Sequence, residues 1–262
     1  MFCLLLAVLT AGCYQDPVFF ELEELEDKVV IEGLVVNGPG PNRVRVSRPL
    51  PLGDARSSEP MSGAEVVLEE STGIAETLTE VEAGVFETQR VFGVPGRTYG
   101  LTVTVDGEMY RGTSTMPEVV FLDSLRVRPE GGWFSVHCYF RDRPGEEDYH
   151  WLRVYEEGRL SEESLYQGTH SDGDTIAWEV KDKFDEGDRI SVEFFTLERA
   201  AFEYITSIRV ISDDYSASDP GDFDPEMPAF VPVMMHNPKT NLSNGALGFF
   251  FAVAVRVYEL TI

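Results

Sequence analysis

Positive charge, cysteine and long hydrophobic runs are all scarce in this sequence. The chain has 21 Lys and Arg residues against 46 Asp and Glu residues, which gives a net charge of −25. A surface this negative repels nucleic-acid phosphates and anionic lipid head groups, so nucleic-acid binding is excluded. Many carboxylates with few lysines are typical of proteins from salty environments, where salt screens self-repulsion. A cationic partner is the alternative explanation, although the acidic residues are spread along the whole chain.

The first thirteen residues form an uncharged, apolar segment that ends in a cysteine. The apolar run Phe2 to Leu9 is shorter than the roughly 20 residues of a membrane-spanning helix, and it matches the hydrophobic part of a secretory signal. The ending Leu9-Thr10-Ala11-Gly12-Cys13 resembles a lipobox, after which the cysteine thiol carries acyl chains. We therefore predict a lipoprotein signal peptide over 1–12 and lipidation of Cys13. The alternative is a short buried strand. No basic residue precedes Phe2, so we expect the natural start a few codons upstream.

The remaining cysteines leave little room for thiol chemistry. Cys3 would be removed with the signal and Cys13 would be acylated, so Cys138 would be the one free thiol. A single thiol forms neither an internal disulfide nor a site of clustered cysteine ligands. Cys138 alternates with Phe134, Val136 and Phe140, which predicts a small buried hydrophobic side chain in a strand.

After the cysteine, the pattern predicts an acidic tether over 13–28 and then a β-sandwich over 29–118. Short strands are expected at 29–36, 43–48, 64–69, 84–90, 98–105 and 109–115, separated by turn residues. The strand 98–105 alternates most clearly, with Tyr99, Leu101, Val103 and Val105 on one face. Asp106-Gly107 predicts a hairpin after it. We expect an immunoglobulin-like or transthyretin-like sandwich.

The second half, 119–262, predicts another β-rich, sandwich-like unit with one helix. Its expected strands are 122–128, 133–141, 149–156, 175–180 and 189–196. Apolar residues at helical spacing predict a helix over about 197–211, with Thr196 as N-cap. Residues 212–232 are rich in Asp and Pro, which predicts a poorly packed surface loop. The ten apolar residues from Ala246 to Val255 predict a buried central strand. The fold class is therefore all-β.

Several short segments, taken in order, resemble domain-of-unknown-function family 4249 over essentially the whole chain. They are Val30-Ile31-Glu32-Gly33, Pro60-Met61-Ser62-Gly63-Ala64, Pro95-Gly96-Arg97-Thr98-Tyr99, Thr113-Ser114-Thr115-Met116-Pro117, Phe140-Arg141-Asp142-Arg143-Pro144-Gly145-Glu146 and Asn237-Pro238 followed by 241–249. The resemblance implies an outer-membrane lipoprotein of the Bacteroidota kind, often encoded beside TonB-dependent transporters. The family brings no catalytic residues. Signals for export to the cell surface usually contain several acidic residues after the cysteine, whereas Tyr14-Gln15-Asp16 contains one. Whether the protein faces the periplasm or the cell surface therefore stays open.

The sequence offers no clear catalytic or metal-binding constellation. The histidines His137, His150, His170 and His236 are scattered, and neither a zinc-protease helix motif, a nucleophile elbow nor a phosphate loop occurs. Carboxylate pairs are so frequent that none indicates a glycosidase dyad. The acidic stretch 212–224 lacks the EF-hand order of ligands, so a solvated loop is favoured over a calcium site. We expect no enzyme, no cofactor and no metal.

Four aromatic residues on predicted strands are the candidate contact residues. Trp133, Tyr139, Trp151 and Tyr155 could form a binding platform, or they could pack one unit against the other. The function that we expect is a membrane-anchored binding or accessory module of a TonB-dependent transporter, held at the membrane by acyl chains on Cys13. A structural envelope lipoprotein without cargo contact is the alternative, and an unrecognised hydrolase is a third. The ligand is not identified by the sequence.

Overall fold

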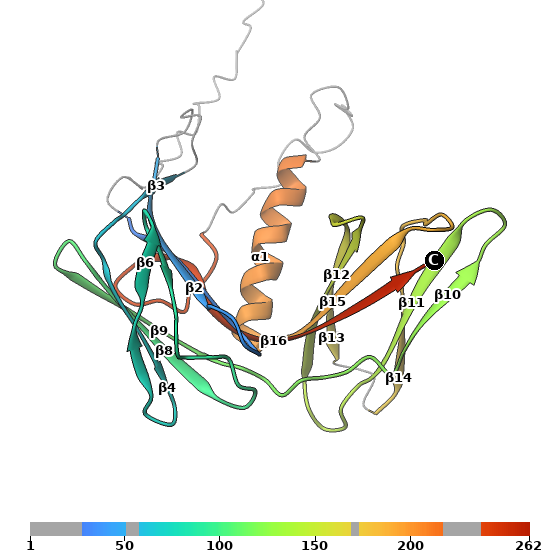
Figure 1. Ribbon diagram of the computed structural model, residues 1–262, viewed down its shortest axis with the longest axis horizontal. Helices are drawn as coiled ribbons and strands as arrows, with labels where there is room; N and C mark the ends of the chain where they lie inside the picture. Colours follow the sequence, from blue (N-terminus) through green and yellow to red (C-terminus); the bar gives the residue numbers. More distant parts are fainter. Residues whose placement is uncertain (1–27, 51–57, 169–172, 217–236) are drawn as a thin grey trace, which may run out of the picture.

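Two β-sandwiches share one long sheet, and a single described helix stands between them (Figure 1). The computed structural model describes residues 28–50, 58–168, 173–216 and 237–262. The predicted signal peptide, Cys13 and most of the tether lie outside the described residues, as does the acidic stretch 217–232. The described part is mostly β with one helix, which confirms the predicted fold class.

The elements follow the alternating pattern of the sequence closely. The strands are β1 (Val30–Val36), β2 (Arg43–Pro49), β3 (Ser58–Pro60), β4 (Glu65–Glu70), β5 (Ala75–Thr77), β6 (Thr79–Glu82), β7 (Val85–Glu87), β8 (Thr98–Val105), β9 (Glu108–Thr115), β10 (Ser124–Pro129), β11 (Phe134–Arg141), β12 (Asp148–Glu156), β13 (Arg159–Gly168), β14 (Thr175–Glu179), β15 (Arg189–Thr196) and β16 (Leu247–Thr261). The helix α1 spans Arg199–Ser216. The β8–β9 hairpin turns at Asp106-Gly107 as predicted, with φ of 53° and 83°.

The first sandwich packs the sheet β5-β4-β8-β9 against β1, β2 and the first half of β16. Tyr99, Leu101, Val103 and Val105 all point into its core, which confirms the predicted face of β8. The second sandwich packs the sheet β10-β11-β14 against β12, β15 and the second half of β16. Each sandwich therefore buries its own apolar cluster, as two packed sheets of alternating strands must.

The strand β16 joins the two sandwiches into one nine-stranded sheet of order β13-β12-β15-β16-β1-β2-β7-β6, with β3 paired to β2. Its first half pairs in parallel with β1, from Val30↔Leu247 to Val36↔Val253. Its second half pairs antiparallel with β15. The predicted central strand at 246–255 is therefore confirmed, and the whole of β16 contributes to the cores of both sandwiches.

Two glycines allow β1 and β16 to approach each other closely. Gly248 has φ +87°, and a Cβ added there would lie 2.2 Å from the Ile31 carbonyl oxygen. A Cβ on Gly33 would lie 2.7 Å from the Phe250 ring. The segments Val30–Gly33 and 241–249, which carry part of the family resemblance, therefore meet across this pairing.

Polar side chains hold β16 where its partner strand changes. Asn37 follows β1, and its amide exchanges hydrogen bonds with the backbone of Val255, at 2.6 Å to the N–H and 3.2 Å to the carbonyl. Asn241 does the same with Phe250, at 2.9 and 2.7 Å. The Ser114 hydroxyl accepts the Ala252 N–H at 2.9 Å. These side chains thus provide hydrogen-bond partners for backbone groups of β16 that have no neighbouring strand.

The structure corrects several details of the predicted elements. The short strands β3, β5 and β6 were not expected. The strand β13 was also not expected, because five of its ten residues are Glu, Ser or Gln and its alternation is weak. It lies at the edge of the sheet and pairs with β12. The helix begins at Arg199, so Thr196 ends β15 and is not the N-cap. The helix also continues to Ser216, so residues 212–216 are helical and are not part of a loop.

Candidate binding pocket between the helix and the sheet

The helix α1 packs on the face of the long sheet that is turned away from both sandwich cores. Leu197, Ala201 and Ile205 are buried there against Phe195, Phe249 and Val253 in a third apolar cluster. From 249 to 255 the odd-numbered residues of β16 face the helix, and the even-numbered residues of the strand enter the sandwich cores. Part of this apolar sheet face stays uncovered beside the helix.

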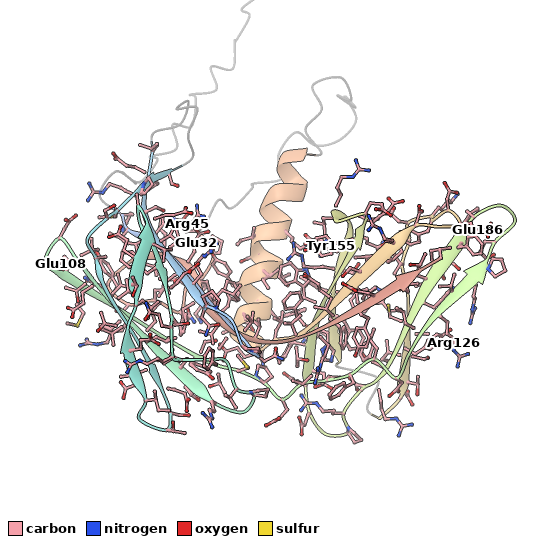
Figure 2. All side chains as sticks on the ribbon, in the orientation of Figure 1. Glu32, Arg45, Glu108, Arg126, Tyr155 and Glu186 are labelled. Atoms are coloured by element: carbon pink, nitrogen blue, oxygen red, sulfur yellow. The ribbon has the colours of Figure 1, made fainter. Side chains whose placement is uncertain are left out.

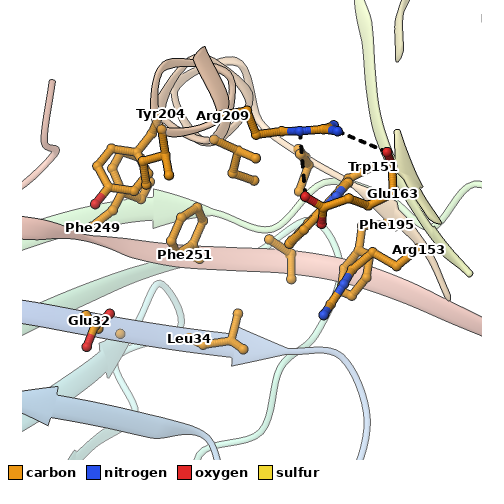
Figure 3. A pocket seen from close by; sticks show the side chains of 15 residues that line it. Glu32, Leu34, Trp151, Arg153, Glu163, Phe195, Tyr204, Arg209, Phe249 and Phe251 are labelled. Atoms are coloured by element: carbon orange, nitrogen blue, oxygen red, sulfur yellow. Dashed lines mark hydrogen bonds and ion pairs between the residues drawn. The ribbon is translucent and has the colours of Figure 1, made fainter. Parts of the chain in front are cut away.

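A pocket of about 470 Å³ lies beside this contact. Its walls come from β1, β12, β13, β15, β16 and α1; the lining residues include Leu34, Trp151, Phe195, Tyr204, Ile208, Phe249 and Phe251. Leu34 and Ile208 are 44% and 42% exposed, so part of the apolar lining is open to solvent. Figure 3 shows the aromatic side chains and the two arginines around this space. The volume is in the range of small-molecule binding sites.

Charged side chains occur mainly at the β12–β13 end of the pocket. Arg209 of α1 donates to the Glu163 carbonyl oxygen at 3.0 Å and approaches the Glu163 carboxylate at 3.6 Å, which links the helix to β13 (Figure 3). Arg153 lies over the Trp151 ring, 5.0 Å from its centre, and reaches Glu193 at 3.5 Å. Both arginines that line the pocket thus have a carboxylate neighbour.

Two N–H donors at the same end lack an acceptor among the residues that the structure describes. They are Trp151 Nε1 and Arg153 Nε, and both atoms are shielded from solvent. A buried donor without a partner costs about 1–3 kcal/mol relative to a satisfied one. The pocket therefore combines a wide apolar wall with a polar end that has unused hydrogen-bonding capacity.

The four predicted contact aromatics do not come together as one platform. Trp151 and Tyr155 lie on β12 on either side of Arg153, on the face that looks toward α1. Trp133 precedes β11, and Tyr139 lies on β11 opposite to the face that enters the second core. The pairs therefore occupy opposite outer faces of the second sandwich. Figure 2 shows the same separation, with Tyr155 on the side of the helix and Arg126, the neighbour of Tyr139, on the outer side.

Cys138 and His150 are both core residues. Burial raises the pKa of the Cys138 thiol to about 12, so the predicted role as a small buried hydrophobic side chain is confirmed. His150 is fully buried between Phe140 and Phe194, and its Nδ1 lies 3.3 Å from the Phe195 carbonyl oxygen. Burial lowers the pKa of His150 to about 4. Its ring is therefore neutral at pH 7.

The segment Phe140–Glu146 of the family resemblance builds a loop next to His150. The Arg143 guanidinium donates to the fully buried Asp148 carboxylate at 2.5 and 2.8 Å, and the Arg143 backbone N–H donates to the other oxygen at 2.8 Å. Neighbouring carboxylates, above all Asp148, raise the pKa of Arg143 against the opposing effect of burial. The hydrogen bonds between Arg143 and Asp148 therefore give this segment a structural role in the loop.

The sequence did not single out the pocket, although its signals were present. The helical spacing of Tyr204, Ile205 and Ile208 predicts a helix, and Phe249 and Phe251 belong to a predicted strand. Neither pattern by itself indicates a cavity. Within the described residues, no three His, Cys, Asp or Glu side chains lie close enough to hold a metal ion. Among the same residues, no helix is both long and apolar enough to cross a membrane.

Comparison with known proteins gives one family match. The family described as Domain of unknown function (DUF4249) matches residues 15–259. No curated protein matches the chain. Among solved structures, the chain is similar to a pullulanase from Anoxybacillus sp. LM18-11 complexed with maltotriose, at 13% identity and a TM-score of 0.22 over 64% of this chain and 24% of that chain.

A second structure of the pullulanase from this organism gives 13% identity and a TM-score of 0.21 over the same shares of the two chains. The chain thus spans about a quarter of the length of these enzymes, 24% in both cases. Similarity at this level indicates neither a shared fold nor a shared activity.

Proposed function

We propose that this chain, which belongs to the DUF4249 family, is a lipid-anchored binding protein of the bacterial outer membrane that assists a TonB-dependent transporter. The observation that carries the proposal is the pocket between α1 and the long sheet, because it is open, apolar and rich in aromatic side chains. Pockets of this size and lining are the usual binding sites for small molecules.

The lipobox supports the location. Acyl chains on Cys13 would hold the protein at a membrane, and two or more chains anchor stably where one binds reversibly. The fourteen residues from 14 to 27 span at most about 50 Å. This tether would keep the sandwiches close to the membrane and raise their effective concentration at a neighbouring transporter.

The outer face of the second sandwich is the surface that we assign to the transporter. Lys183 Nζ lies 5.0 Å from the centre of the Trp133 ring, and Arg126 lies 5.1 Å from that of Tyr139. Arg128 donates to the Tyr139 hydroxyl at 2.8 Å. We call these five residues the outer cationic patch. Aromatic side chains and arginine are enriched at interface centres, and this patch presents cations in a chain of net charge −25.

Lipidation gives the first prediction. Cys13→Ser should leave the protein uncleaved or soluble, because the serine hydroxyl does not accept the acyl group. Fractionation of membranes and intact mass measurement check this outcome. Cys3→Ser is the matched control, since Cys3 lies inside the predicted signal and its replacement should leave processing unchanged. Normal maturation and membrane partitioning of Cys13→Ser would contradict the lipobox.

Co-purification with the transporter gives the second prediction. From detergent-solubilised membranes, the wild-type protein should retain a TonB-dependent transporter, identified by mass spectrometry. Trp133→Ala should weaken this association by about 2 kcal/mol, the usual size of an interface hot spot, with the yield of folded protein unchanged. Trp151→Ala is the control on the opposite face and should retain the transporter.

If no transporter co-purifies with the wild-type protein at either low or high salt, the accessory function is wrong. The structural alternative, an envelope lipoprotein that scaffolds a complex without contacting cargo, then takes its place. If Trp151→Ala rather than Trp133→Ala loses the transporter, the docking surface lies on the helix side instead.

A further inference from the structure

The polar end of the pocket points to a specific ligand chemistry. Trp151 Nε1 and Arg153 Nε are both donors, both lie at the β12 wall, and both lack an acceptor among the described residues. The Arg153 guanidinium rests on the Trp151 ring, and its ion pair to Glu193 is long at 3.5 Å. The Arg153 guanidinium also lies 5.1 Å from the centre of the Tyr155 ring. An acceptor oxygen that reached this end of the pocket would satisfy the two unpaired donors.

The charges around the pocket decide between a neutral and an anionic acceptor. The lining contains two carboxylates, Glu32 and Glu163, and two guanidinium groups, Arg153 and Arg209. Each guanidinium already has a carboxylate neighbour, Glu193 and Glu163 respectively. An anionic ligand would therefore add charge to a balanced site in a chain of net charge −25. An uncharged oxygen satisfies the donors without that repulsion.

The rest of the lining selects an apolar body. Leu34 and Ile208 form the exposed part of the lining, and the aromatic rings of Phe195, Tyr204, Phe249 and Phe251 form the rest of the apolar wall. Removal of apolar ligand surface from water at this wall favours binding. An alkyl chain or a small ring system fits such a wall, whereas a sugar or a peptide with many polar groups would leave those groups unpaired.

We propose that this pocket binds a small apolar molecule with one uncharged carbonyl oxygen, such as a fatty-acid ester, and that Trp151 and Arg153 donate to this oxygen. The inference rests on the proposed function in so far as it names the ligand class of the binding protein. The ligand lies on the helix side, opposite to the outer cationic patch, so that cargo and transporter can be bound together.

Calorimetric titration of the full chain with methyl octanoate tests the proposal. The chain carries Cys13→Ser so that it can be purified without detergent, and octanoate serves as the matched anionic probe. Methyl octanoate should bind with one-to-one stoichiometry, and octanoate should bind about tenfold more weakly. Trp151→Phe and Arg153→Met each remove one donor while keeping most of the apolar wall. Each should weaken methyl octanoate binding about fivefold to tenfold.

Two controls separate the pocket from unspecific binding. Ile208→Trp fills the exposed part of the pocket and should abolish binding. This variant keeps the apolar N-terminal segment of the parent chain, so any binding to that segment would remain. Trp178→Phe replaces a tryptophan on β14, away from the pocket, and should bind as the parent does. Circular dichroism and thermal melting verify the fold of each variant.

Absence of binding by the parent chain, or full binding by Ile208→Trp, overturns the site. Equal or tighter binding of octanoate, or unchanged affinity in both Trp151→Phe and Arg153→Met, overturns the assigned acceptor. These measurements contain no transporter, so their failure is distinct from failure of the co-purification that tests the proposed function.

Discussion

Replacing Gly248 by alanine is expected to lower the free energy of unfolding by about 4 kcal/mol and Tm by about 10 °C. The residue has φ +87°, which a side chain rarely adopts, and the added Cβ would lie 2.2 Å from the oxygen and 2.9 Å from the carbon of the Ile31 carbonyl. These atoms belong to the paired strand β1 and cannot move aside as a flexible side chain would. Chemical and thermal denaturation of the purified variant measure the effect.

Gly245→Ala is the matched control for this change. Gly245 also has a positive φ, of 70°, but its nearest contact for an added Cβ is the end of the Lys28 side chain at 3.7 Å. Only backbone strain is added there, so the loss should be about 1 kcal/mol. Equal losses in the two variants would show that the close pairing of β1 and β16 contributes nothing beyond strain.

Acidification is expected to destabilise the protein through His150. The pKa of His150 is about 4 in the folded protein, lowered by burial from the ordinary 6.5. The unfolded chain therefore binds the proton first, and stability is lost as pH falls from 6.5 toward 4. Between pH 7.5 and pH 5 this effect alone amounts to about 2 kcal/mol. Urea denaturation at a series of pH values measures it.

His150→Asn separates this contribution from that of the carboxylates. The variant has no titrating ring, so its stability should fall less between pH 7.5 and pH 5, by about 2 kcal/mol, even if its stability at pH 7.5 is lower. His150→Leu removes the polar group altogether and should show the same reduced slope. Slopes equal to that of the wild-type protein in both variants would contradict a neutral buried His150.

The prediction from sequence was most successful where the signal is local. The face of β8, the Asp106-Gly107 hairpin and the burial of Cys138 all follow from alternation and turn chemistry within a few residues. The edge strand β13 was missed for the same reason, since its polar sequence alternates weakly and its strand character depends on pairing with β12. The end of α1 was misplaced because Ser212 to Ser216 have low helix propensity but extend an existing helix.

The pocket was beyond sequence reasoning because its walls come from six elements distributed over the chain. Apolar residues of α1 and β16 each have a sufficient explanation as core, so nothing local marks the space between them. The aromatics Trp133 and Trp151 belong to successive predicted strands, which suggests a common surface. Those strands belong to opposite sheets of one sandwich, and their outer faces point away from each other.

The sequence by itself determined that the chain is mostly β, which face of β8 and of the strand around Cys138 is buried, and that the apolar segment 246–255 is central. These properties depend on the two-residue period of strands and on local turns. The tertiary structure alone decided that β16 pairs in parallel with β1, and that Asn37 and Val255 bond across 218 residues of chain. It also decided that position 248 requires a residue without a side chain. Finally, it brought the donors of Trp151 and Arg153 to one end of an apolar pocket. Such features depend on which strands pair and in which register, and pairing between distant segments is set by the packing of the whole core.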